Sequence, residues 1–335
     1  MTIESPKIEN QQEAEKETPK EKLQRRLGTI AAWGLISTGV LGASKVLDVR
    51  EKNQYKPKAV ISRIEKKQPI VEKEKTELNE KIEYLLKHFG PEVIASLESK
   101  AKEAKNAEQK PIKVQGFEKM GVSSEKLKQI WSEKYYPKGW VDGEALDVEY
   151  REKQVINTKK NLQAVASYSG EGTSEKPGTI LFFKVTDRMP KDDKETLALI
   201  ANLDSVFSHE LGHANEWGQD EQMSFKQRLD FLFDVSQKFS KSTLDDGIAT
   251  IERIEKINML DKQKEWDAKV SEYWAYCCNG YFNFPEVLKQ TFPSDFEMVD
   301  KYVKMEDANY NPVEKQAQKQ EVIKQMAEKE VHPVK

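Results

Sequence analysis

A histidine–glutamate–histidine pattern in the 335-residue chain contains the residue types that metal chemistry needs. It reads Ser208-His209-Glu210-Leu211-Gly212-His213, so the two histidines are four positions apart. On an α-helix this spacing places both imidazoles on one face, about 6 Å apart along the axis, where they can bind one ion. Glu210 is rotated by about 100° from His209, to a place where a carboxylate can take a proton from metal-bound water. This is the H-E-x-x-H zinc pattern.

The identity of a third ligand is the next question, because a catalytic zinc ion normally has three protein ligands and an open fourth position. The other histidines, His88 and His332, lie far from the pattern in the sequence. A metzincin would need glycine at position 216 and histidine or aspartate at position 219. The chain has Glu216 and Gln219 there, so that class is excluded. We therefore expect a carboxylate.

Glu272 is the best candidate for this carboxylate. It is the lone acid among aromatic and small residues between Val270 and Phe282, and a buried charge needs a partner or a metal ion. The sequence between the pattern and Glu272 is helical in character and could return the chain antiparallel to the first helix. Weaker candidates remain at Glu216, Asp220, Glu265 and Asp267.

The elements around the pattern must hold these side chains in place. Apolar residues recur at helical spacing from Lys194 to Phe207 and on to Ala214, which predicts a helix that contains the pattern. Asp192 and Asp193 favour a helix N-terminus at its start. Short strands are predicted before this helix at Ala145–Tyr150, Gln154–Ile156, Leu162–Tyr168 and Thr179–Val185, and helices after it at Phe225–Phe239 and Ile248–Leu260.

The His-Glu-Leu-Gly-His pattern and the later Ser-Glu-Tyr-Trp-Ala segment together resemble the gluzincin metallopeptidases. The closest likeness is to catalytic domains similar to that of anthrax lethal factor, and it covers roughly Val155–Met305. The resemblance implies a zinc-dependent endopeptidase in which His209, His213 and Glu272 hold Zn²⁺ and Glu210 is the general base. It also implies an α+β, zincin-like domain with a small β-sheet over the active-site helix.

The resemblance is incomplete around the third ligand. Tyr276 stands where the family often has a second acid, so it is a candidate for an oxyanion-stabilising or ligand-supporting role. The alternative function is a catalytically inactive zincin-fold protein that binds peptides or acts as a scaffold at the membrane. The sheet of zincins can pair with an extended peptide substrate along an edge strand. The candidate residues for that edge are Leu181, Phe182, Phe183 and Lys184.

The overall composition narrows the possible partners. Charged residues make up 33% of the chain, and they are concentrated outside the catalytic stretch. A net charge of −3 and a pI of about 6.0 give no reason to expect binding to nucleic acid. Cys277 and Cys278 are the only cysteines, and as neighbours they cannot join distant segments. We expect them to be core thiols and the partner to be a peptide or protein substrate.

The N-terminal sequence predicts attachment to a membrane. An uncharged run of about 18 residues spans positions 27–44, near the lower limit for a membrane-spanning helix. We expect it to anchor the protein with the catalytic domain outside the cytoplasm; the alternatives are a cleaved signal peptide and a buried core helix. Residues 45–135 could also cover the cleft as a propeptide. The expected segments are a disordered tail at 1–26, the anchor at 27–44, a charged stalk or coiled-coil spacer at 45–77, a helical region at 78–139, the catalytic domain at 140–305 and a polar tail at 306–335.

Overall fold

The computed structural model describes most of the chain outside its N-terminal segment. Residues 1–26 and 27–44, predicted as tail and anchor, and the helix predicted at 248–260 lie outside the described residues. Within the part that is described, no helix is both long and apolar enough to span a bilayer. The described residues are 55–66, 70–103, 112–141, 146–153, 155–157, 162–169, 178–184, 189–215, 223–241 and 262–330.

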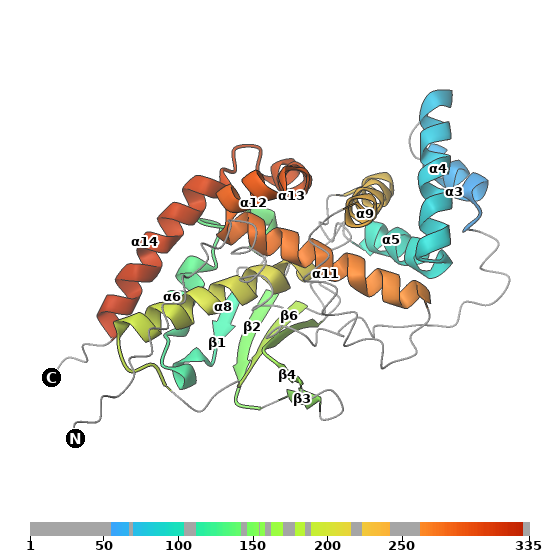
Figure 1. The fold of residues 1–335 in the computed structure, drawn as a ribbon. Helices are drawn as coiled ribbons and strands as arrows, with labels where there is room; N and C mark the ends of the chain where they lie inside the picture. Colours follow the sequence, from blue (N-terminus) through green and yellow to red (C-terminus); the bar gives the residue numbers. More distant parts are fainter. Residues whose placement is uncertain are drawn as a thin grey trace, which may run out of the picture.

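A four-stranded mixed sheet forms one layer of the fold (Figure 1). Its strands, in spatial order, are β1 (Lys113–Gln115), β2 (Leu146–Arg151), β6 (Gly178–Phe183) and β5 (Ala166–Ser169). The β1–β2 and β2–β6 pairs are parallel, and the β6–β5 pair is antiparallel. Two further strands, β3 (Val155–Asn157) and β4 (Leu162–Ala164), form a separate antiparallel pair. The chain is otherwise mostly helical, which agrees with the α+β class predicted from the sequence.

The position of β6 shows that one prediction was wrong. Its apolar run was predicted to form a sheet edge, but it pairs with β2 on one side and with β5 on the other. The physical reason is that a nearly continuous apolar run is typical of an interior strand. Among the described strands, β5 lies at this edge of the sheet. The residues wrongly placed at the edge are Leu181, Phe182 and Phe183 in β6 and Lys184 just after it.

Two 22-residue helices, α8 (Asp193–Ala214) and α11 (Lys262–Asn283), pack against each other beside the sheet (Figure 1). The predicted start of α8 is confirmed, because the side chain of Asp192 accepts a hydrogen bond from the Glu195 amide at 2.8 Å. Both β5 and β6 contact α8, so the sheet lies against the helix that carries the histidine pattern. The remaining helices of the C-terminal half are α9 (Phe225–Phe239), α12 (Pro285–Thr291), α13 (Pro293–Glu306) and α14 (Pro312–Glu330).

The region predicted as a charged stalk folds against the rest of the protein where it is described. Its helices are α3 (Pro57–Glu65) and the start of α4 (Glu72–His88), and α5 (Pro91–Glu103) follows. Helix α4 packs on α9, with Lys81 Nζ 2.6 Å from Asp230 Oδ1 and the rings of Tyr84 and Phe233 in edge contact. Within the predicted stalk, Glu74 forms an ion pair with Lys226 of α9 and Arg63 forms one with Glu98 of α5. The stalk prediction missed this packing because a few apolar residues, including Val60, Ile61 and Ile64, are enough to bury one face of α3.

The predicted domain boundary at residue 140 falls inside the hydrophobic core. Trp131 stacks on Phe207 of α8 at a centroid distance of 4.5 Å and on Phe182 of β6 at 5.7 Å. The segment before residue 140 therefore packs into the same core as the sheet and α8, and it is not purely helical. Its elements are β1, the 3-10 helix η3 (Phe117–Met120), α6 (Ser124–Ile130) and α7 (Lys138–Val141).

The predicted polar tail at 306–335 is also corrected. Most of it forms α14, which packs along α8. Ile323, Met326 and Ala327 are buried although the helix as a whole is polar. A narrow apolar stripe is sufficient to dock a helix, and the low overall hydropathy of the segment concealed it.

Candidate metal centre

Gly212 allows α8 and α11 to approach each other closely. A Cβ atom placed on Gly212 would lie 2.8 Å from Ala275 Cα, closer than side-chain atoms pack. The indole Nε1 of Trp274 donates a hydrogen bond of 3.0 Å to the Gly212 carbonyl oxygen. The two histidines lie near Gly212 on α8, and both approach Glu272 of α11.

Three side chains from these helices converge at one point. His209 Nε2 lies 3.3 Å from Glu272 Oε2, and His213 Nε2 lies 3.6 Å from Glu272 Oε1. One ligand atom from each residue falls within 4.8 Å of the others, so the group could hold a metal ion. The imidazole rings are nearly perpendicular, at 86°, with centroids 4.9 Å apart. Two imidazole nitrogens and one carboxylate oxygen are a donor set that suits Zn²⁺.

The carboxyl group of Glu272 is held in its charged form. Burial opposes ionisation, but the imidazoles of His213 and His209 outweigh it and keep the pKa of Glu272 well below its usual range. Glu272 is therefore a carboxylate at neutral pH, the form that binds a metal ion. Its side chain keeps 13% of its surface exposed, more than either histidine.

Glu210 lies beside this cluster and is completely buried. Neither of its carboxylate oxygens makes a hydrogen bond of ordinary geometry with a described residue, although the Tyr168 backbone amide of β5 lies close enough to lower the pKa of Glu210. Burial raises this pKa and the Glu272 charge adds to the rise, while both histidines, like the Tyr168 amide, lower it. A buried carboxylate with so little hydrogen bonding is costly. Such a group beside a cluster of ligands is expected where the partner is a bound water or substrate.

Ser271 is a site residue that the sequence analysis missed. Its hydroxyl lies 3.0 Å from His213 Nδ1. When Nδ1 carries the proton and donates it to this oxygen, Nε2 is left with a free lone pair that points to the metal position. By contrast, no described residue pairs with His209 Nδ1. The only sequence signal for Ser271 is its place directly before Glu272.

Tyr276 lies one helical turn after Glu272 and packs against His209, with ring centroids 4.8 Å apart. Burial raises the pKa of Tyr276 well above its usual value, and the charges of Glu272 and Glu210 add to this. Its hydroxyl therefore keeps its proton at neutral pH and can act as a hydrogen-bond donor. The structure thus places the Tyr276 ring beside the cluster, and its oxyanion-stabilising or ligand-supporting role stays a prediction.

The weaker ligand candidates have side chains that the structure does not describe. Glu265 and Asp267 lie in the first two turns of α11, before Glu272. Glu216 and Asp220 lie outside the described residues. Among the side chains that are described, Glu272 is the carboxylate that joins the two histidines.

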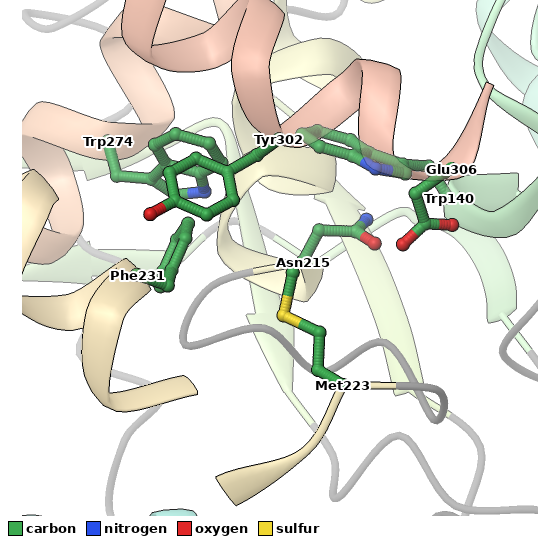
Figure 2. A pocket seen from close by; sticks show the side chains of 7 residues that line it. All are labelled: Trp140, Asn215, Met223, Phe231, Trp274, Tyr302 and Glu306. Atoms are coloured by element: carbon green, nitrogen blue, oxygen red, sulfur yellow. The ribbon is translucent and has the colours of Figure 1, made fainter. Parts of the chain in front are cut away.

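A small cavity lies at the C-terminal end of α8 (Figure 2). Its volume of about 10 Å³ is room for about one water molecule, and none of its lining residues belongs to the candidate metal centre. The cavity is therefore too small and in the wrong place to be a substrate pocket. It is lined by Trp140, Asn215, Met223, Phe231, Trp274, Tyr302 and Glu306.

Comparisons with known proteins found no relative of this chain. No protein-family model, curated protein or solved structure matches the chain. The functional argument is therefore built on the residues of this chain and their geometry.

Proposed function

We propose that this protein is a zinc-dependent metalloendopeptidase with a zincin-like catalytic domain. One observation carries the proposal: ligand atoms of His209, His213 and Glu272 lie within 4.8 Å of one another beside the buried carboxylate of Glu210. A nearby base that is not itself a ligand is what metal-assisted hydrolysis requires.

The residues of the centre divide the chemistry between them. Bound Zn²⁺ supplies Lewis acidity, which activates water near neutral pH and polarises a peptide carbonyl. Glu210 is the base that accepts the proton of the attacking water and returns it to the leaving amine. Burial suits it to this task, because a raised carboxyl pKa makes the group a better proton acceptor. The Tyr276 hydroxyl is the candidate donor to the oxyanion that develops on the substrate.

Strand β5 is the proposed binding edge for an extended substrate. The Phe183 amide donates to the Val165 carbonyl oxygen at 2.8 Å, across the start of the β5–β6 ladder. In the alternating antiparallel pattern, the backbone groups of Ala166 and Tyr168 then point away from β6. The Tyr168 amide acts on Glu210, so this edge runs past the catalytic base. A peptide added to β5 would lie beside the metal position.

We also propose that residues 27–44 tether the protein to a membrane with the catalytic domain outside the cytoplasm. The support is the uncharged run in the sequence. Alkaline extraction and protease protection of membranes that carry the full chain test both parts. Release of the intact chain by alkali would contradict the tether, and complete protection of the domain within sealed right-side-out cells would contradict its orientation.

The test of the enzymatic proposal compares metal content and peptidase activity across matched variants. Glu210→Gln should keep one zinc ion per chain and lose about 10²- to 10⁴-fold in activity, because only the base is removed. Glu272→Ala and His213→Ala should lose the metal. Glu286→Gln, at an exposed position in α12, is the control and should behave as wild type. A fully active Glu210→Gln protein would refute the assignment.

A catalytically inactive peptide-binding or scaffolding protein with the same fold is the second candidate. It is favoured by Tyr276 standing where the resembled family often has an acid, and by His209 Nδ1, which has no partner among the described residues. In that case the wild type would bind zinc and peptides but cleave none of a diverse peptide library. Measurable turnover that disappears in Glu210→Gln would exclude it.

A further inference from the structure

Helix α14 places one lysine inside the protein. Lys319 is 1% exposed, and its ammonium nitrogen lies 2.8 Å from Asp204 Oδ2 in α8. It also donates hydrogen bonds to the Tyr136 hydroxyl at 2.9 Å and to Asn283 Oδ1, at the end of α11, at 3.1 Å. The Tyr136 hydroxyl in turn donates to Asp204 Oδ1 at 2.8 Å. A single buried cation thus connects α14, α8 and α11.

A chain of hydrogen bonds continues from this cation towards the metal centre. The Asn283 amide donates to Ser208 Oγ at 2.5 Å and to Asn279 Oδ1 at 3.0 Å. Asn279 Oδ1 also accepts from the hydroxyls of Ser205 and Ser208, at 3.1 and 3.3 Å. Ser208 directly precedes His209. These four side chains form a polar ladder between α8 and α11, and Lys319 closes one end of it.

The polar ladder and the metal ligands belong to the same helix–helix interface. Asn279 lies two helical turns after Glu272 on α11, and therefore on nearly the same face. On α8, Ser208 adjoins His209, and the close contact at Gly212 follows. A shift of the polar ladder would change how α8 crosses α11. It would therefore change the distance between the histidines and the carboxylate that complete the centre.

A buried ion pair is by itself weak evidence for a contribution to stability. Burial lowers the pKa of Lys319, and the Asp204 charge raises it. The attraction between the two charges therefore offsets a desolvation cost that apolar residues would not incur. Apolar replacements of similar volume are often neutral or stabilising. Apart from Asn279 Nδ2, which has no hydrogen-bond partner among the described residues, the polar groups of this network are bonded to one another. A bonded polar network favours one arrangement of the elements that it joins.

We propose that Lys319 is a positioning residue of the metal centre. Through Asn283 and Ser208 it fixes the crossing of α8 and α11, and so the separation of His209 from Glu272. The inference rests on the proposed function for the presence of a bound metal ion. It assigns a role at the centre to a helix that supplies none of the ligands.

The experiment uses the full chain and removes both charges together. The double variant Lys319→Met/Asp204→Asn keeps the approximate volume of both side chains, and asparagine can still accept a hydrogen bond from Tyr136. Ile323→Ala is the matched control, because Ile323 is buried on the same helix without polar contacts. Three quantities are measured: the thermal midpoint of unfolding, the zinc affinity by competition with a chelator, and the visible absorption spectrum of the Co²⁺-loaded protein.

The double variant should unfold near the wild-type temperature but bind zinc about 10- to 100-fold more weakly, with a changed Co²⁺ spectrum. Ile323→Ala should unfold at a lower temperature and keep the wild-type affinity and spectrum. Ser208→Ala breaks the other end of the polar ladder by removing one oxygen atom, and should reproduce the metal defect of the double variant.

The outcomes separate this inference from the proposed function. Wild-type affinity and spectrum in the double variant would overturn the inference alone, as would an equal metal defect in Ile323→Ala. If the double variant does not fold, Ser208→Ala decides, and an unchanged affinity there overturns the inference. A wild-type chain that binds no metal would overturn the proposed function and leave no centre to position.

Discussion

Replacement of Gly212 by alanine is the most direct test of how the two helices assemble the centre. The added Cβ atom would meet Ala275 Cα at 2.8 Å, about 0.6 Å short of ordinary van der Waals contact, which begins at 3.4 Å. The obstacle is backbone, so α8 and α11 must separate. Zinc–ligand distances tolerate about 0.2 Å, and His209 and His213 flank the contact. We therefore expect zinc affinity to fall about 10- to 100-fold, as for other losses of ligand support.

The expected effect of Gly212→Ala on stability is small by comparison. Overpacking costs about 1–3 kcal/mol, and the helix propensity of alanine returns about 1 kcal/mol, so the free energy of unfolding should fall by about 0–2 kcal/mol. Chelator competition measures the affinity and urea unfolding measures the stability.

Gly280→Ala on α11 is the control for this substitution. Its Cβ would meet only the flexible end of Leu288, at 3.2 Å, so metal binding should be unchanged. A Gly212→Ala protein that binds zinc as tightly as the wild type would show that the close contact does not set the ligand geometry.

Three further predictions concern the centre and its substrate. Ser271→Ala should weaken zinc binding about tenfold or more, since His213 loses its Nδ1 partner, and unchanged affinity in a chelator titration would contradict the role of the serine. Burial raises the pKa of Glu210 in the folded protein above its ordinary value of 4.5. Proton binding by this carboxyl group therefore stabilises the folded state below pH 4.5, and that contribution is lost as the pH rises through the folded pKa. Metal-free Glu210→Gln should therefore be more stable than metal-free wild type at neutral pH, with a difference that shrinks towards pH 4.5; a constant difference in urea unfolding would refute this. N-methylation of single backbone amides in a peptide hydroxamate inhibitor removes one hydrogen-bond donor at a time. It should weaken binding by about 1 kcal/mol, roughly fivefold in Kd, at each amide that pairs with Ala166 or Tyr168. An inhibitor whose Kd is unchanged by methylation at every position would exclude pairing with β5.

The local part of the centre could be predicted from the sequence because helical periodicity determines it. A spacing of four residues places His209 and His213 on one face wherever the helix lies. The start of α8 also follows from a local signal, the acidic cap at Asp192. Glu272 was harder to predict, because its nearness to the histidines depends on how α11 packs on α8. It could still be proposed because an isolated acid among apolar residues is unusual.

Features that depend on packing between elements could not be predicted in the same way. The sequence shows that residues 178–183 favour a strand, but strand order in a sheet depends on partners elsewhere in the chain, and so the edge was misplaced. Lys319 illustrates the same limit. It lies in a polar segment with other lysines, such as Lys324, which is exposed. No local pattern distinguishes the one lysine that faces a buried aspartate.

The position of Lys319 in the chain has a consequence for biosynthesis. Its contact with Tyr136 spans 183 residues of sequence, and such non-local contacts form late in folding. A ribosome adds roughly 5–20 residues per second, so the three ligand residues emerge seconds before the cation that closes the polar ladder. Until then Asp204 lacks its counter-charge and the α8–α11 interface is incomplete. The order of synthesis thus delays completion of the proposed metal centre until most of the chain has been made.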